Sequence, residues 1–299
     1  AFCASISSFT SENDEVIIPT PWYFNHHMWL QMAGVKSIPL DTDANMNPIL
    51  EKAEALITDR TRAIVLVSPN NPSGAIYSNQ LLQNFFDLCK SNQIRLIIDE
   101  TYKDFHPNAS QPHTLLENNN WDQVLTILYS FSKTYRMTGH RIGALLTSKE
   151  NLIEIEKALD TFTVCPPQLG QYAANWGLNN LEAWAAERRT EILQRAKHFS
   201  EKFQPLSAAG WSLRGCGAYF AFVEHPFEDE SNILAPLILR DQGILLMPGT
   251  MFYPKHNPLG SRSFRIAFAN IDKNKISTLL ERLKDLSYQR LNSKNKMIN

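Results

Sequence analysis

The stretch Tyr129-Ser130-Phe131-Ser132-Lys133-Thr134-Tyr135-Arg136-Met137-Thr138-Gly139-His140-Arg141-Ile142-Gly143 follows a short, β-branched apolar run, residues 124–128, which predicts a buried strand. Lys133 therefore comes just beyond a strand, among small hydroxyl residues. Two serines and the guanidinium of Arg141 form a donor set that suits a phosphate dianion. Taken alone, a lysine after a strand is far more often a solvated surface charge, and serine-rich loops are common turns. The rest of the chain therefore has to supply the other groups of a site.

Apolar runs alternate with helical patterns through the first half of the chain. The predicted strands are residues 15–19, 35–40, 63–68, 94–98 and 124–128, and the predicted helices between them are residues 1–11, 25–33, 48–57 and 78–89. Nearly continuous apolar strands alternating with helices are typical of a mostly parallel sheet covered by helices on both faces. We therefore expect an α/β fold, which places ligands at the carboxyl ends of its strands.

The second half of the chain predicts a smaller α+β domain. Helices are expected at residues 152–159, from 168, at about 181–203, at 233–240 and at 275–286, and strands at 211–224, 243–247 and 263–269. We assign residues 1–180 to a large domain, and residues 181–299 to an interdomain helix and a small C-terminal domain. The Lys- and Asn-rich tail after Arg290 is predicted to be a frayed end.

Composition excludes several classes of protein. The 299 residues are 43% hydrophobic and 20% charged, with a formal net charge of -1, so no basic footprint for nucleic acid is present. No run approaches the roughly 20 apolar residues of a membrane span. The chain has four cysteines, none of which forms a Cys-x-x-Cys pair: Cys3, Cys89, Cys165 and Cys216. This spacing argues against a disulfide framework and against a zinc site, and it favours a reduced, cytoplasmic compartment.

Polar or aromatic residues follow several of the predicted strands. Tyr23 lies in a turn after residues 15–19, and Asn71 lies in the rigid turn Pro69-Asn70-Asn71-Pro72-Ser73-Gly74. Each has an ordinary explanation, as a core aromatic or as turn chemistry. Asp99 ends the strand predicted at residues 94–98, either as a cap or loop ion pair or as the partner of a cationic ring nitrogen. A buried carboxylate needs a positive partner to stay ionised, and a pyridinium is one.

With these motifs in order, the chain resembles the fold-type I pyridoxal-phosphate (PLP) aminotransferases of classes I and II. The resemblance runs over nearly the whole chain. Its motifs are Asn71-Pro72-Ser73-Gly74, Asp99-x-x-Tyr102, Ser130-x-Ser132-Lys133, Arg141 eight positions beyond the lysine, and Phe264-Arg265-Ile266.

The resemblance implies a role for each matching residue. Lys133 forms the Schiff base with PLP and then moves a proton between the substrate α-carbon and C4′ of the cofactor. Asp99 keeps the pyridine nitrogen protonated, so that the ring is an electron sink. The remaining roles are as follows: Asn71 and Tyr102 bond the ring O3′ oxygen, Tyr23 stacks on the ring, Ser130, Ser132 and Arg141 bind the phosphate, and Arg265, with Asn71, binds the substrate α-carboxylate. Spacing alone would make Arg265 only the polar position of an alternating strand.

The expected activity is a ping-pong transfer of an amino group between an L-amino acid and a 2-oxo acid. The segment Pro21-Trp22-Tyr23-Phe24-Asn25 looks like relatives that act on aromatic and other neutral amino acids, and we expect it to form an aromatic entrance. Two alternatives use the same residues: β-elimination by a PLP-dependent C-S lyase, and the aminotransferase-like sensor domain of a transcription regulator. The family also implies a homodimer, with active sites between subunits.

The chain departs from the family pattern at its start. A glycine-rich, phosphate-cradling loop and an N-terminal arm would lie before Ala1. On family grounds we expect a truncated form that lacks roughly a hundred residues and binds PLP more weakly than a complete relative. Arg136 and His140 stand where relatives often carry Gly and a large apolar residue. Either could face the substrate side chain, with Arg136 a candidate for binding a second carboxylate, although surface placement is the simpler interpretation.

Overall fold

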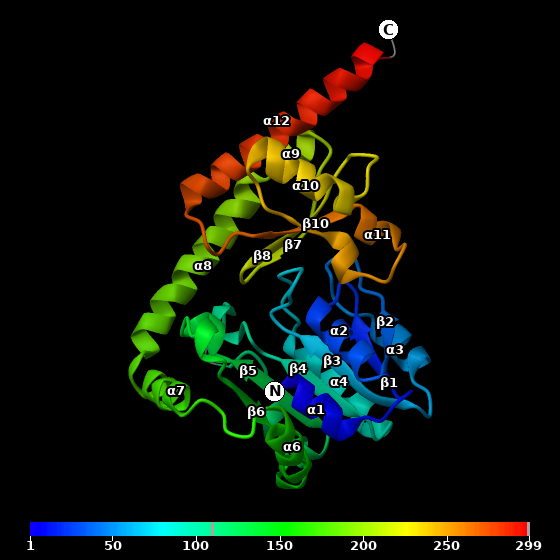
Figure 1. Cartoon of the computed structure of the whole chain (residues 1–299), viewed down its shortest axis with the longest axis vertical. Coiled ribbons are helices and arrows are strands. Elements are labelled where there is room, and N and C mark those ends of the chain that lie inside the picture. The colour runs from blue at the N-terminus through cyan, green and yellow to red at the C-terminus, as the bar shows by residue number, and fades with distance from the viewer. Residues whose placement is uncertain (109–110, 298–299) are drawn as a thin grey trace. The chain divides into compact units, whose positions relative to one another are not determined.

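The computed structural model describes residues 1–108 and 111–297. The chain divides into two compact units (Figure 1). The first unit comprises Ala1–Asp43, Asn47–Asn70 and Ile76–Thr190, and the second comprises Ala44–Met46, Asn71–Ala75 and the chain from Glu191. The units part inside helix α8 (Glu182–Lys202). The domain division that we placed at residue 180 stays a prediction.

The first unit is built on a six-stranded sheet in the order β2-β1-β3-β4-β5-β6. Strands β1 to β5 run parallel, and β6 pairs antiparallel with β5. This sheet confirms the predicted α/β class. The strands are β1 (Glu15–Pro19), β2 (Lys36–Leu40), β3 (Thr61–Val67), β4 (Arg95–Asp99), β5 (Leu125–Ser130) and β6 (Gly143–Leu146).

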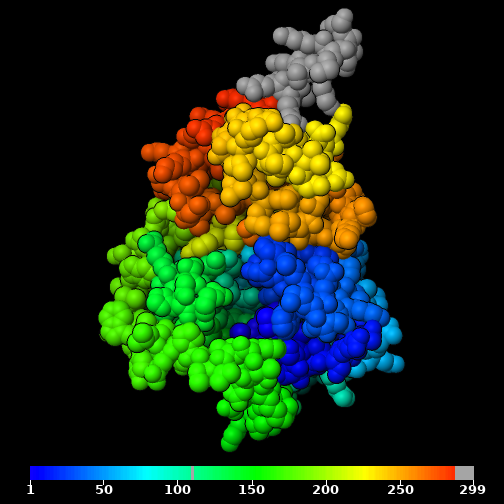
Figure 2. Space-filling view, viewed as in Figure 1, coloured from blue at the N-terminus to red at the C-terminus, as the bar shows by residue number. Residues whose placement is uncertain are grey.

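Helices cover both faces of this sheet. On one face α1 (Phe2–Phe9) and α2 (Phe24–Met32) contribute Ile6 and Leu30 to a core shared with strand residues such as Val16 and Val65. Alternate strand residues point to the other face, where α4 (Asn79–Ser91) contacts β4 and buries Phe85. The remaining helices of this unit are α3 (Leu50–Leu56), α5 (Phe131–Thr134), α6 (Lys149–Phe162), α7 (Gln168–Asn180) and the short η1 (Lys103–Phe105), η2 (Leu115–Glu117), η3 (Trp121–Gln123) and η4 (Thr138–His140). Figure 2 shows α1, in the darkest blue, beside the green α6 that it contacts.

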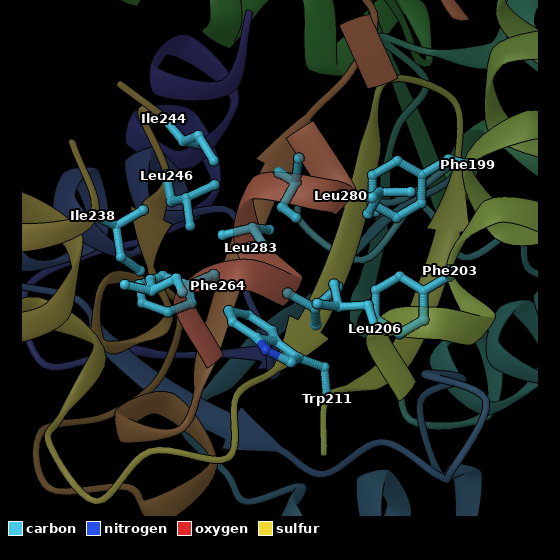
Figure 3. Packing of buried hydrophobic residues seen from close by; sticks show 14 of the residues in the cluster. Phe199, Phe203, Leu206, Trp211, Ile238, Ile244, Leu246, Phe264, Leu280 and Leu283 are labelled. Carbon is cyan, nitrogen blue, oxygen red and sulfur yellow. The ribbon is translucent and has the colours of Figure 1, made fainter. Parts of the chain in front are cut away.

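The second unit is an antiparallel sheet with helices packed on one hydrophobic core. The strand order is β7-β8-β10-β9. Figure 3 shows this core, in which Trp211, Phe264 and Leu283 pack together with residues of α8 and α9. The elements are α9 (Gln204–Ala208), β7 (Ser212–Gly217), β8 (Phe220–Glu224), α10 (Ser231–Gln242), β9 (Met247–Pro248), η5 (Gly249–Phe252), α11 (Pro258–Ser261), β10 (Ser263–Ala267) and α12 (Lys273–Met297).

Three of the predictions for the second unit were wrong. The predicted strand 211–224 is a hairpin, β7 and β8, in which Ala218 has a positive φ of 44°. Residues 243–246 are not a strand, because Gly243 ends α10 with a left-handed backbone and only Met247 and Pro248 reach β10. The tail after Arg290 is not frayed, because α12 continues to Met297; residues 298–299 lie outside the described residues.

Within residues 1–108 and 111–297, no helix combines the length and the apolar character needed to cross a bilayer.

Candidate active site

A cavity of about 310 Å³ opens at the carboxyl edge of the parallel strands of the first unit. Its lining includes five of the nine residues singled out from the sequence: Tyr23, Asp99, Ser130, Ser132 and Arg141. They come from four separate segments, and they meet because parallel strands present their carboxyl ends at one edge of the sheet.

Asp99 is buried at 8% exposure and accepts hydrogen bonds on both carboxylate oxygens. The backbone N–H and the hydroxyl of Thr101 donate to Oδ1 at 3.0 and 2.6 Å. The Nε2 of His26 lies 3.2 Å from Oδ2. Burial alone would raise the pKa of this carboxyl, but the bonds and charge from His26 and the bonds from Thr101 outweigh burial and lower the pKa. Asp99 is therefore ionised near neutral pH.

We expect His26→Phe to raise the pKa of Asp99. Phenylalanine keeps the stacking of His26 on Phe2, whose ring centroids are 3.9 Å apart, and removes the donor. A carboxyl with a lowered folded pKa stabilises the fold above its unfolded pKa of about 3.9 and loses this contribution as pH falls through the folded value. The variant should therefore lose about 2 kcal/mol at pH 7, the worth of a hydrogen bond to a charged group, and progressively less in acid.

Carbon-13 NMR titration of Asp99 and urea unfolding at several pH values measure both effects. The matched control is His27→Phe, since His27 stacks on Trp22 and bonds Ser37 instead of Asp99. The same stability loss at every pH would show that the His26 contact does not act through the ionised carboxylate.

Lys133 lies in the single-turn helix α5, directly after β5. Ser130 caps this helix by accepting the Ser132 N–H at 3.3 Å, so its own O–H remains available to donate. The Nζ of Lys133 lies 5.9 Å from the centroid of the Tyr102 ring, and Tyr102 is buried. The predicted lysine and its predicted aromatic neighbour are thus brought together by β4 and β5, which are adjacent in the sheet.

The other two predicted residues, Asn71 and Arg265, belong to the second unit and bond each other. Arg265 Nη1 donates to Asn71 Oδ1 at 2.8 Å, across 194 positions of sequence. The Arg265 guanidinium carbon also lies 4.6 Å from the centroid of the Phe220 ring and 5.3 Å from that of Phe252. Arg265 is the polar position of β10, as its spacing indicates, and it is also held in a defined geometry against these rings.

The turn containing Asn71 reaches β7 through glycines. A Cβ at Gly74, which has a φ of 74°, would lie 2.3 Å from the backbone nitrogen of Gly217. Only glycine accommodates both this backbone conformation and this approach. The segment 71–75 therefore packs with the second unit, although the residues that precede it in the chain, up to Asn70, belong to the first unit.

The predicted aromatic entrance is only partly formed. Tyr23 lines the cavity, but Trp22 is buried at 4% exposure, stacks on His27 and belongs to the core of the first unit. Phe24 packs against the same core. Arg136 and His140 are both exposed, which agrees with the simpler interpretation of each.

Sequence reasoning missed His26 and Thr101 as partners of Asp99. The spacing of His26 is a usable signal, because it lies three positions after Tyr23 on α2 and residues three apart share a helix face. Thr101 stands two positions after Asp99, where a threonine hydroxyl can reach back to the carboxylate.

The residues lining the cavity fit the chemistry of PLP. Ser130, Ser132 and Arg141 are donors suited to its phosphate, and Tyr23 supplies an aromatic face. A carboxylate has about four lone-pair positions, of which His26 and Thr101 use three on Asp99, so one remains for a ring N–H.

Comparison with known proteins gives a consistent family assignment. The sequence profile described as aminotransferase class I and II matches residues 4–283. The chain is 27% identical over 286 residues to the (5-formylfuran-3-yl)methyl phosphate transaminase of Methanocaldococcus jannaschii, covering 94% of this chain and 71% of that protein. It is 26% identical over 278 residues to the aspartate aminotransferase of Thermotoga maritima, covering 91% and 69%.

The fold is also similar to solved structures. The aromatic aminotransferase of Pyrococcus horikoshii OT3 superposes with a TM-score of 0.86 at 25% sequence identity, covering 97% of this chain and 77% of that one.

Proposed function

Because the chain belongs to the aminotransferase class I and II family and is thus a PLP-dependent aminotransferase, we propose that it moves an amino group between an L-amino acid with an aromatic or other neutral side chain and a 2-oxo acid, by a ping-pong mechanism. The observation that carries the site assignment is the buried Asp99, ionised and triply hydrogen-bonded, in one cavity with Tyr23 and Arg141.

PLP supplies an aldehyde that condenses with amines and a ring that accepts the electron pair of a deprotonated α-carbon. Asp99 holds the proton on the ring nitrogen, and it can do so because His26 and Thr101 keep it ionised inside the protein. Ser130, Ser132 and Arg141 fix the phosphate, and Tyr23 and Tyr102 orient the ring.

Lys133 serves as the proton carrier in this proposal. With PLP and substrate bound, the Lys133 amine would take the proton from the substrate α-carbon and would return it on the same face, while PLP would supply the electron sink. The lysine lies in α5, directly after β5, and β5 pairs with β4, the strand that ends in Asp99. The proton carrier and the ring-nitrogen partner are therefore positioned by adjacent strands.

Arg265 binds the substrate α-carboxylate, with Asn71 beside it. The contact between Arg265 and Asn71 engages Nη1 and aligns the guanidinium fork. A planar fork suits a carboxylate in a two-pronged geometry.

The preference for aromatic or neutral donors rests on Tyr23 in the cavity lining and on the likeness to the P. horikoshii enzyme, whose name gives aromatic amino acids as its substrates. The likeness to the T. maritima aspartate aminotransferase makes dicarboxylates the competing substrate class. If an amino-donor screen favours aspartate over phenylalanine, dicarboxylates are the substrate class and the proposed aromatic or neutral donors are not.

The experiment that tests the function uses the full-length protein with PLP. A visible absorption band, followed by 2-oxo acid-dependent transfer from aromatic donors, supports the proposal. Release of ammonia and pyruvate without a 2-oxo acid would indicate the C-S lyase alternative instead. A normal band with no turnover of any donor would favour the sensor domain.

We also propose a homodimer, formed in part by the outer face of α7. Gly170, Ala174 and Gly177 are the buried residues of this helix, while Leu169, Tyr172 and Trp176 are 84%, 67% and 58% exposed. In Figures 1 and 2, which share one view, α7 lies at the rim of the first unit with side chains uncovered. Such a concentration of exposed apolar side chains marks an interaction surface, and the family implies a second copy as its partner.

The double substitution Leu169→Glu with Trp176→Glu should weaken this dimer at least about 100-fold, since both remove apolar anchors and add charge. Sedimentation velocity over a concentration series measures the change. Leu116→Glu, at a leucine that is 43% exposed in η2, is the matched control and should leave the dimer intact. A double variant that sediments like the wild type would remove α7 from the interface.

We place the enzyme in the cytoplasm. All four cysteines are free in the structure, which fits a reducing compartment.

A further inference from the structure

Asp104 lies outside the residues used so far, yet it contacts both ends of the segment that carries Lys133. Its Oδ2 accepts a hydrogen bond from the hydroxyl of Tyr129, the residue just before Ser130. The same oxygen accepts a second hydrogen bond, of 2.7 Å, from the hydroxyl of Thr134, the residue just after Lys133. One carboxylate oxygen therefore joins two positions five residues apart, and the residues between them include Ser130, Ser132 and Lys133.

The helix between these two positions cannot hold its own place. Helix α5 has four residues. A helix of that length is unstable by itself, because ordering the backbone of the first turn costs more free energy than the hydrogen bonds of one turn contribute. Its position depends on tertiary contacts. Phe131 supplies an apolar one, in a cluster with Met137 and Ile142. The polar contact is the hydrogen bond from the Thr134 hydroxyl to Asp104. Thr134 is only 1% exposed, so its hydroxyl needs this partner inside the protein.

Asp104 also links the two halves of the site. It lies in η1, whose first flanking residue is Tyr102, three positions beyond Asp99. The bonds to Tyr129 and Thr134 thus tie the segment after β4 to the segment after β5. The Nζ of Lys133, 5.9 Å from the Tyr102 ring centroid, reaches across this same pair of segments. The surroundings of Tyr129 are consistent with a firm contact, because burial and the neighbouring Asp104 carboxylate raise the pKa of its phenol.

We propose that Asp104 is a positioning residue for the reaction, whose carboxylate fixes the lysine-bearing turn, through Tyr129 and Thr134, relative to Asp99 and Tyr102. Asp104 touches neither the cofactor nor the substrate in this proposal. Its contribution is to keep the Lys133 amine within reach of the α-carbon, since a displacement of about 1 Å in a reacting group can cost 10²-fold in rate. The proposal rests on the proposed function for its effect on rate, but not for its effect on the turn.

The first test needs neither cofactor nor activity. Hydrogen exchange of the cofactor-free protein, read by mass spectrometry on peptides that cover residues 131–137, should be at least about tenfold faster in Asp104→Ala and in Thr134→Val, with β3 unchanged, because only the turn opens. Thr134→Ser keeps the hydroxyl and should restore slow exchange. Unchanged exchange in residues 131–137, or equal acceleration throughout the sheet, would overturn the proposal.

The second test is kinetic. Asp104→Ala and Thr134→Val should lower kcat for transamination about 10- to 100-fold and change KM for the amino donor by less than about threefold, while Thr134→Ser recovers most of kcat. Tyr129→Phe should have little further effect in the Asp104→Ala background, because both changes break the same bond. Wild-type kcat in Asp104→Ala would overturn the proposal.

A matched control removes the same kind of bond elsewhere. The Thr58 hydroxyl donates to the buried Glu15 carboxylate at 2.6 Å, at the amino end of β1. Thr58→Val should lower the unfolding midpoint in urea without changing kcat or exchange in residues 131–137. If the wild-type protein fails to transaminate, the proposed function fails, and the hydrogen-exchange result still decides the role of Asp104 in the turn.

Discussion

Lys133→Ala is expected to abolish transamination, with a loss of kcat of about 10⁴-fold or more. The substitution removes both the amine that bonds PLP and the group that carries the proton between two carbons, and general acid-base catalysis alone is worth about 10²- to 10⁴-fold. Alanine leaves α5 intact, because Ser130 still caps it and Phe131 still packs in its cluster. Steady-state kinetics with an aromatic amino donor and a 2-oxo acid measures the loss.

Borohydride reduction of the PLP-bound protein, followed by peptide mapping, gives an independent measurement. The pyridoxyl group should be found on Lys133 in the wild type and on no lysine in the variant. Lys149→Ala, at the exposed start of α6, is the control and should retain both label and turnover. A Lys133→Ala protein that transaminates at the normal rate, or a label fixed elsewhere in the wild type, refutes the assignment of this lysine.

Asp99→Asn is expected to lower kcat by about 10²- to 10³-fold, the range seen when one preorganised electrostatic group is removed from a site. Asparagine has the same size and an oxygen that still accepts from Thr101, so the cavity keeps its shape. What is lost is the negative charge that holds a proton on the ring nitrogen. Without that proton the ring is a weaker electron sink, and the α-carbon holds its hydrogen more tightly.

The measurement is the α-proton exchange rate of the donor in deuterated water, together with kcat. Asp87→Asn, an exposed aspartate of α4 on the same domain, is the matched control. If the Asp99 variant binds PLP and exchanges the α-proton within about threefold of the wild-type rate, the carboxylate does not control the ring charge.

The parallel sheet was predictable because its strands are buried on both faces. Such strands are nearly uniform apolar runs. The run predicted at residues 15–19 coincides with β1, and the run predicted at 94–98 differs from β4 by one residue at each end. The second unit was harder to predict. Residues 211–224 were predicted as one strand, but the turn that divides them sits at Ala218 and Tyr219, residues that are not typical of turns.

The antiparallel β6 was also missed. Gly143–Leu146 is short, and three of its four residues are exposed, so it lacks the continuous apolar signal of the other strands. It forms because β5 presents an unpaired edge, with Ser130 opposite Gly143. A Cβ at position 143 would lie 2.8 Å from the Tyr129 carbonyl oxygen, so glycine permits this pairing. The pairing depends on the neighbour strand more than on the local sequence.

By itself the sequence determined the alternation of strand and helix, the order of the motifs and hence the family, because these depend on local hydrophobic pattern and on residues at fixed positions. Only the tertiary structure decided which polar groups meet. His26, on α2, reaches Asp99 at the end of β4, and Asp104 reaches Thr134 across 30 positions. Hydrogen bonds depend on distances of about 3 Å, and such distances between remote residues are set by the packing of strands and helices, which no local pattern encodes.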